Sequence, residues 1–152
     1  MVTIRELSDK DFASVCALFH SVFTGPPWYD DWSDPDQMQA YIRDLMCNPN
    51  SLAFGCFSDD CLIAASLGSV MHWFSGTQYY IYEFFVSAAM QNTGIGSKLL
   101  QEIETQIRSK GIVSVFLQTG DEMPAYKFYS KHGFTQIPHH VSMMKTLSGE
   151  VK

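Results

Sequence analysis

The sequence lacks long hydrophobic runs. No apolar stretch among its 152 residues reaches the roughly 20 residues that a membrane-spanning helix needs. The first residues, 1–6, contain neither the basic region nor the apolar segment that is typical of a secretion signal. We therefore expect a cytoplasmic protein with no membrane partner.

Positive charge is also scarce. The sequence has 10 Lys and Arg residues against 16 Asp and Glu residues, which gives a formal net charge of −6. This balance argues against binding to the phosphate backbone of nucleic acid, and it is compatible with a cationic partner.

Cysteines are few and isolated. The four of them form no C-x-x-C pair and have no metal-ligand spacing with histidine. We expect small buried or half-buried thiols ahead of disulfides, and no metal site. These cysteines are Cys16, Cys47, Cys56 and Cys61.

The most informative stretch is a strand-like run that leads into a helix. Residues 79–86 are rich in aromatic and β-branched side chains, which fit a pleated, half-buried surface. A loop with the sequence Gln-Asn-Thr-Gly-Ile-Gly-Ser follows at 91–97. The next apolar positions have helical spacing and are Ile95, Leu99, Ile103 and Ile107.

A glycine loop that opens a helix is suited to binding an anion. The first N–H groups of a helix have no internal partner, and the helix dipole adds partial positive charge there. Gly94 and Gly96 lack a Cβ atom, so a phosphate group can come close to the backbone. A dinucleotide fingerprint would need a third glycine where Leu99 stands, and a Walker loop would need a Gly-Lys-Ser/Thr ending. The motif alone is equally compatible with an ordinary tight turn.

A second motif, Ala-Tyr-Lys-Phe-Tyr-Ser-Lys-His-Gly-Phe, occupies residues 125–134. Together with Gln91-x-x-Gly94-x-Gly96, it resembles the GNAT (Gcn5-related) N-acetyltransferase superfamily in order, spacing and type of element. The resemblance covers the second half of the chain. Residues 83–86 before Gly-Ile-Gly-Ser are similar to diamine acetyltransferases, and residues 124–129 are similar to aminoglycoside-type members. Both groups acetylate polycationic amines.

The resemblance implies an α/β GNAT fold. Its central sheet is mixed, mostly antiparallel and splayed between two central strands, with about four flanking helices in the order β-α-α-β-β-β-α-β-α-β. The hydrophobic pattern agrees and predicts strands at 2–7, 52–57, 61–71, 79–86, 113–117 and 141–145. We expect a single domain over residues 1–147 and a frayed tail over 148–152.

The helix boundaries are predicted from capping residues. Ser8 with Asp11, and Ser33 with Asp36, have the spacing of capping boxes in front of the first two helices. The later helices are expected to begin near Gly94 and Pro124 and to stop at Lys110-Gly111 and at Gly133.

The resemblance also implies acetyl-CoA as the donor. Its pyrophosphate would lie on the helix start, and its pantetheine arm would pair with the backbone of the preceding strand. The expected cofactor-binding residues are Phe84, Phe85, Val86, Gln91, Asn92, Thr93, Gly94, Ile95, Gly96 and Ser97. Many members carry an asparagine that contacts CoA at the position of Glu122, so this chain departs from the pattern there.

Two residues are candidates for proton transfer. Tyr129 matches the family tyrosine that acts as general acid near the CoA sulfur, although a tyrosine here could also pack the last helix. Glu83 is the candidate base, because apolar surroundings would raise the pKa of its carboxyl group. A solvent-facing role for Glu83 is the alternative. A bulge in the strand would also shift the alternation of side chains between the two faces of the sheet, so the face of Glu83 could not be counted from the sequence. Some family members place the carboxylate where Tyr80 stands.

The acceptor site is expected in the first half. Residues 28–36 are acidic and aromatic, and both carboxylates and aromatic faces attract ammonium groups. We expect Trp28, Asp30, Asp31 and Glu83 to bind the substrate. Helix capping and packing explain these residue types equally well.

The predicted function is transfer of an acetyl group from acetyl-CoA to a primary amine of a small cationic acceptor, a polyamine or aminoglycoside-like molecule. A sensor or interaction module that binds acyl-CoA without turnover is one alternative. An N-acetyltransferase of proteins or peptides is another. A homodimer is possible.

Overall fold

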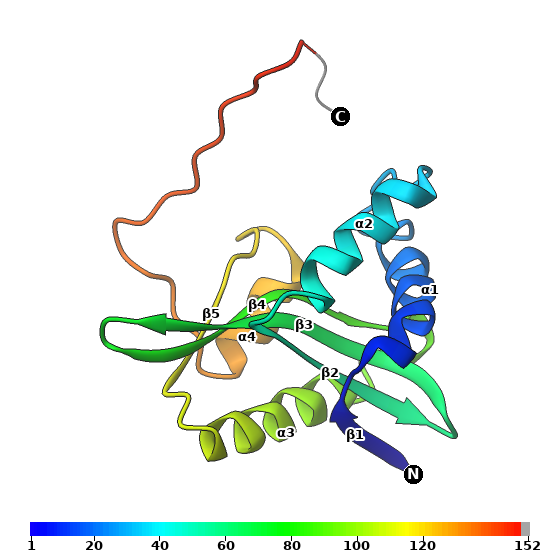
Figure 1. Ribbon diagram of the computed structural model, residues 1–152, viewed down its shortest axis with the longest axis horizontal. Coiled ribbons are helices and arrows are strands. Elements are labelled where there is room, and N and C mark those ends of the chain that lie inside the picture. Colours follow the sequence, from blue (N-terminus) through cyan, green and yellow to red (C-terminus); the bar gives the residue numbers. More distant parts are fainter. Residues whose placement is uncertain (150–152) are drawn as a thin grey trace. The chain divides into compact units, whose positions relative to one another are not determined.

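The computed structural model, which describes residues 1–149, contains four α-helices and a five-stranded sheet (Figure 1). The chain divides into two compact units, residues 1–118 and the part from Thr119 onward. The first contains β1 (Val2–Glu6), α1 (Phe12–Phe23), α2 (Pro35–Met46), β2 (Ser51–Ser58), β3 (Cys61–Trp73), β4 (Gly76–Val86), α3 (Ile95–Ser109) and β5 (Ser114–Leu117). The second contains α4 (Pro124–Lys131).

The strands lie in the order β1-β2-β3-β4-β5, and all neighbours are antiparallel except β4 and β5, which are parallel. The prediction of a mixed, mostly antiparallel sheet is confirmed. Strand β5 pairs with β4 only over residues 78–81, whereas β4 continues to Val86. The two strands therefore stop pairing halfway along β4, as expected of a splayed sheet.

Helices cover both faces of the sheet (Figure 1). Helices α1 and α2 lie on one face, where Phe19, Ile42, Leu67 and Phe85 belong to one buried cluster. Helix α3 lies on the other face and buries Leu99, Leu100 and Ile103 completely. The apolar spacing of each helix thus determines which side it turns to the sheet.

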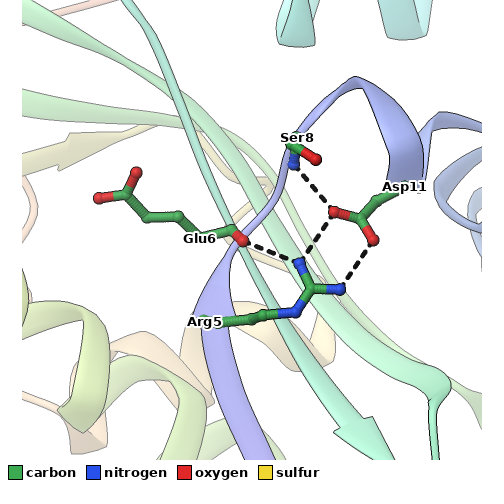
Figure 2. Close-up of polar contacts among 4 residues, drawn as sticks. All are labelled: Arg5, Glu6, Ser8 and Asp11. Atoms are coloured by element: carbon green, nitrogen blue, oxygen red, sulfur yellow. Dashed lines mark hydrogen bonds and ion pairs between the residues drawn. The ribbon is translucent and has the colours of Figure 1, made fainter.

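An ion pair fixes the chain where β1 turns toward α1 (Figure 2). The Arg5 guanidinium donates to both carboxylate oxygens of Asp11 at 2.9 Å, and the Ser8 N–H donates to Asp11 Oδ2 at 2.9 Å. The hydrogen bond from Arg5 lowers the pKa of Asp11, against the effect of its burial. The predicted contact between Ser8 and Asp11 is present, and Arg5 reinforces it.

The start of α2 differs from the prediction. Asp34, and not Ser33, is the N-cap: its Oδ1 accepts hydrogen bonds from the N–H groups of Asp36 and Gln37 at 3.0 and 3.2 Å. The Ser33 hydroxyl donates to Asp31 instead, at 2.6 Å. An aspartate directly before Pro35 caps the helix better because its carboxylate also favours the positive end of the helix dipole.

The predicted last strand is wrong. Residues 141–145 form no strand in the described part of the chain, and Val141, Met143 and Met144 are 80%, 91% and 84% exposed. The observed order is β-α-α-β-β-β-α-β-α. Alternating apolar residues favour a strand, but a strand forms only when it pairs with a neighbour. Of the predicted tail at 148–152, residues 150–152 lie outside the described residues.

Candidate active site

A bulge in β4 determines where Glu83 points. Leu67 of β3 pairs with Glu83, but the next residue, Gly68, pairs with Ile81, so Tyr82 is an extra residue in β4. Adjacent residues of β3 face opposite sides of the sheet, and so do their partners Ile81 and Glu83. Without the bulge these two residues would share a face. The bulge therefore turns Glu83 to the side that α1 and α2 cover.

Gly68 is required opposite this bulge. A Cβ atom at this position would lie 2.3 Å from the carbonyl oxygen of Tyr80 and 2.6 Å from the Tyr79 ring. Any other residue would push the two strands apart. The sequence analysis missed Gly68, although a glycine inside an otherwise apolar strand is a recognised sign of a bulge or close backbone approach.

The Glu83 side chain is half-buried and hydrogen-bonded. The Tyr41 hydroxyl, from α2, donates to Glu83 Oε1 at 2.6 Å. Burial raises the pKa of Glu83, the Tyr41 hydrogen bond lowers it, and the nearby negative charge of Asp30 raises it again. The net direction is upward, which suits a group that must accept a proton near neutral pH.

A cluster of rings joins the acidic, aromatic segment at 28–36 to the elements around Glu83. Trp28 packs edge-on against Phe23, with ring centroids 5.1 Å apart, and Trp32 stacks on Tyr41 at 5.4 Å and 17°. Phe23 in turn contacts Phe85 of β4 at 5.7 Å. The rings thus attach the segment to α1, α2 and β4.

The two predicted substrate aspartates have different surroundings in the structure. Asp30 is exposed, and its charge acts on Glu83. The Asp31 carboxylate accepts hydrogen bonds from the Ser33 N–H at 3.1 Å and from its hydroxyl at 2.6 Å. Of the four predicted substrate residues, Asp30 is the one whose charge raises the pKa of Glu83. Trp28 packs on α1, and Asp31 supports the local turn.

The predicted cofactor loop has a backbone shaped for close approach. Gly94 is the N-cap of α3 with φ 87°, and Asn92 is also left-handed with φ 61°. Gln91 Nε2 donates to the Val86 carbonyl at 3.1 Å, and the Thr93 hydroxyl donates to the Met90 carbonyl. These bonds fold the loop back onto the end of β4.

The helix start itself is open to an anion. A Cβ atom at Gly94 would have no atom within 4 Å, and the first turn of α3, which holds Ile95, Gly96 and Ser97, contains no acidic residue. Lys98 is the first residue of the helix whose N–H bonds back to Gly94, at 3.0 Å. The helix dipole and the open space at Gly94 fit a phosphate group there.

The predicted pantetheine residues lie on β4 beyond its pairing with β5. Phe85 is 3% exposed and packs on Phe19 and Phe23, while Phe84 and Val86 are half-buried. A short 3-10 turn at 88–90 connects this strand to the loop at 91–97.

Tyr129 belongs to the second unit. It is buried in the last turn of α4, and its ring lies 5.4 Å from those of Phe128 and Phe134. The Phe134 N–H donates to the Tyr129 carbonyl at 3.1 Å, just after Gly133 ends the helix with φ 88°. Its role as an acid stays a prediction. Glu122, at the family's asparagine position, is exposed.

Tyr41 and Trp32 are further residues that the sequence analysis missed. Tyr41 lies three residues after buried Met38 and four before buried Leu45, so helical spacing placed it beside the core stripe of α2. Nothing local indicated that its hydroxyl would reach a carboxylate 42 residues away.

Among residues 1–149, no group of three or more His, Cys, Asp and Glu side chains is arranged to hold a metal ion. In the same part of the chain, none of the helices combines the length and apolar character that crossing a membrane requires.

Comparison with solved structures shows the same fold in many acetyltransferases. An aminoglycoside acetyltransferase from an uncultured soil metagenomic sample, solved in complex with sisomicin, is 23% identical over 97% of both chains, with a TM-score of 0.74. The aminoglycoside N-acetyltransferase AAC(6′)-Iy, solved in complex with CoA, is 16% identical over 95% of both chains, with a TM-score of 0.74. A possible acetyltransferase from Clostridium difficile 630 is 14% identical over 97% of this chain and 99% of its own, with a TM-score of 0.82. At these identities the likeness shows the fold.

Sequence comparison identifies the family. No curated protein sequence gives a significant match. The model of the "Acetyltransferase (GNAT) family" matches residues 12–134, which include the bulged strand, the glycine loop and α4. The predicted α/β GNAT fold is confirmed, and the chain belongs to the acetyltransferase (GNAT) family.

Proposed function

We propose that this protein transfers an acetyl group from acetyl-CoA directly to a primary amine of a small cationic acceptor, a polyamine or an aminoglycoside-like molecule. The observation that supports it most is the bulge in β4, which turns Glu83 toward the acidic segment beside Asp30. The same strand leads into the glycine-capped start of α3. A proton acceptor and an anion site are thereby carried by one strand and its loop.

Acetyl-CoA supplies the acetyl group as a thioester. Its pyrophosphate binds at the backbone of residues 92–97, where the start of α3 favours negative charge. Gln91 holds the loop against the end of β4. The backbone of residues 84–86 aligns the pantetheine arm, and an N–H group there donates to the thioester carbonyl oxygen.

Two side chains move protons in this proposal. Glu83 takes a proton from the ammonium group of the acceptor, so that the amine nitrogen can form a bond to the thioester carbon. Tyr129 gives a proton to the sulfur as the carbon–sulfur bond breaks. The nitrogen loses its second proton to solvent, and Tyr129 regains a proton from solvent. This division of tasks needs Glu83 as a carboxylate and Tyr129 as a neutral phenol.

The charge of the acceptor side favours a cation. The negative charge of Asp30 contributes to the raised pKa of Glu83, and the whole chain has a net charge of −6. Neighbouring structures include the sisomicin complex and a ribosomal-protein-alanine N-acetyltransferase from Brucella melitensis biovar Abortus 2308, so this fold serves both small-molecule and protein acceptors. The paired carboxylates are the reason to prefer the small polycation.

A panel of amines tests the proposal. Spermidine, putrescine, an aminoglycoside, a peptide with a free N-terminus and a neutral primary amine are each incubated with acetyl-CoA, and release of free thiol is followed. Rapid turnover with the polycations supports the proposal, and a preference for the peptide points to protein acetylation. Stabilisation by acetyl-CoA without turnover of any amine would support the non-catalytic acyl-CoA module.

A cytoplasmic location, a possible homodimer and a single domain over residues 1–147 are further parts of this proposal. Gel filtration with light scattering measures the oligomeric state directly.

A further inference from the structure

Glu83 is held by a side chain that the proposed reaction does not use. Among residues 1–149, Tyr41 is the hydrogen-bond partner of Glu83, and its hydroxyl lies 2.6 Å from Oε1. The other oxygen, Oε2, makes no hydrogen bond in this part of the chain. In the same residues, Trp32 Nε1 is the buried polar side-chain atom that has no hydrogen-bond partner. Because Oε2 has no partner either and is not such a buried atom, it is accessible to solvent. One oxygen is therefore occupied, and the other is available.

The Tyr41 ring has little freedom to move. Trp32 stacks on it nearly parallel, with centroids 5.4 Å apart and planes at 17°. Phe19 contacts it from α1 at 5.9 Å and 58°. Helix α2 also buries Met38 and Ile42 close to Tyr41 in the same core. The hydroxyl is thus aimed by a packed cluster that joins α1, α2 and the acidic segment.

The Tyr41 hydroxyl is the donor in this pair, and its surroundings favour the protonated phenol. Burial, followed by the charge of Glu83, raises the pKa of Tyr41 far above its ordinary value. The titratable side chains of Asp30, Asp44 and Tyr82 complete the surroundings of this pair. None of them is a cation, so Tyr41 is the group here that favours the ionised form of Glu83.

We infer that Tyr41 is a positioning residue that fixes Glu83 Oε1, so that Oε2 is aimed at the acceptor amine, with Trp32 bracing the tyrosine ring. This inference rests on the proposed function, in which Glu83 is the base. It assigns a different role to each carboxylate oxygen: Oε1 accepts the hydrogen bond from Tyr41, and Oε2 takes the proton of the amine. The rings of Phe19 and Trp32 would then have a role beyond packing, because they hold Tyr41 of α2 where its hydroxyl reaches Glu83.

The test is Tyr41→Phe, which keeps the ring and its stacking on Trp32 but removes the hydroxyl. The matched control is Tyr82→Phe, which removes a hydroxyl from the same neighbourhood but from a side chain that is 43% exposed. Glu83 is titrated directly by NMR of the ¹³C-labelled carboxyl group, with Glu83→Gln to assign its signal. Turnover with the best amine of the panel is measured against pH.

In Tyr41→Phe we expect a higher pKa of Glu83, because the hydrogen bond that lowers it is gone. The acid limb of kcat/KM should move to higher pH in the same direction. At neutral pH kcat should fall by about tenfold, which corresponds to one hydrogen bond to a charged group. The melting temperature and the response to acetyl-CoA should stay close to those of the unchanged protein. Tyr82→Phe should leave the Glu83 titration where it is.

An unchanged Glu83 titration and an unchanged acid limb in Tyr41→Phe would overturn the inference and leave Tyr41 as a packing residue. The NMR titration does not depend on turnover, so the two claims fail separately. A shifted titration with no loss on Glu83→Gln would refute Glu83 as the base, and with it the role that we assign to Oε2.

Discussion

Helices α2 and α3 begin with opposite chemistry. At α2 the Asp34 carboxylate accepts two backbone N–H groups, and Asp36 adds a second acid in the first turn. At α3 the N-cap is Gly94, which has no side chain to accept a hydrogen bond, and the first turn has no acid. Both helix starts carry the positive end of a dipole. The protein neutralises the first with its own residues, and at the second we propose that an anion binds.

The same difference extends to the two sides of the proposed site. The segment that leads into α2 brings Asp30 to Glu83, so the acceptor side is negative. The loop that leads into α3 offers backbone N–H groups, so the cofactor side is positive. A polycationic amine and an anionic CoA would therefore approach by opposite attractions. Five changes test this contrast, in order of decreasing expected effect.

Gly94→Glu should weaken CoA binding most. A carboxylate at the start of α3 would repel the pyrophosphate, and like charges in contact cost several kcal/mol, on the order of a thousandfold in Kd. The matched control is Gly111→Glu at the other end of α3, since Gly111 has φ 79° and equally open space. Both changes strain the backbone alike. Calorimetry should show CoA binding lost in the first variant only, and a normal Kd for Gly94→Glu would refute the anion site.

Glu83→Gln should lower kcat by a few hundredfold, within the range for one acid–base group. The effect should shrink at high pH, where the amine loses its proton without help. Because the pKa of Glu83 is raised, the unchanged enzyme should lose activity with falling pH earlier than an ordinary glutamate would allow. A pH profile of kcat/KM measures both. An equal loss at all pH values would argue for a binding role instead.

Tyr129→Phe should lower turnover by about tenfold to a hundredfold and leave CoA affinity unchanged, because the phenol acts only as the thiolate leaves. Tyr126→Phe, one turn earlier on α4, is the control. Single-turnover kinetics with saturating amine separate the chemical step from product release. If turnover is the same in both variants, Tyr129 packs α4 and another group is the acid.

Asp30→Asn should raise the acceptor KM several-fold at low salt and leave kcat nearly unchanged, because it removes binding shared by the ground and transition states. The effect should fade as salt rises, since exposed charges are screened over about 10 Å at 0.1 M. The KM of acetyl-CoA should not change. Asp31→Asn is the comparison, because its carboxylate is occupied by Ser33. A larger effect at Asp31 would contradict the assignment of Asp30.

Asp34→Ala should have the smallest effect and should leave function intact. Loss of this N-cap should cost about 1 kcal/mol of unfolding free energy, as measured in urea. Affinity for CoA should be unchanged, since the α2 start is neutralised by its own side chains. If CoA binding weakened in this variant, the contrast between the two helix starts would not hold.

Several features of this site were predictable because they are local. A glycine before an apolar helical repeat indicated the open start of α3, and the aromatic run at 79–86 indicated β4. The predicted N-cap of α2, Ser33, was one residue too early. Ser33 and Asp34 are both good capping residues, and the backbone conformation decides which of them caps the helix. Residues 141–145 had the alternation of a strand and formed none, because pairing is not a local property.

The orientation of Glu83 was not predictable. Its face depends on whether β4 gains a residue at Tyr82, and that depends on how close Gly68 of the neighbouring strand lets the two backbones come. The hydrogen bond from Tyr41 to Glu83 joins residues 42 positions apart, and no local sequence pattern around either residue indicates the other as its partner.

The sequence by itself determined that α2 starts among acidic residues and that α3 starts at a glycine, because capping is a local property of the chain. It also determined the family, because the two motifs keep their order and spacing. Only the tertiary structure decided that the carboxylate of Glu83 meets Tyr41 and Asp30 on the face covered by α1 and α2. The physical reason is strand register: a single extra residue reverses every following side chain, and only the neighbouring strand can hold that extra residue in place.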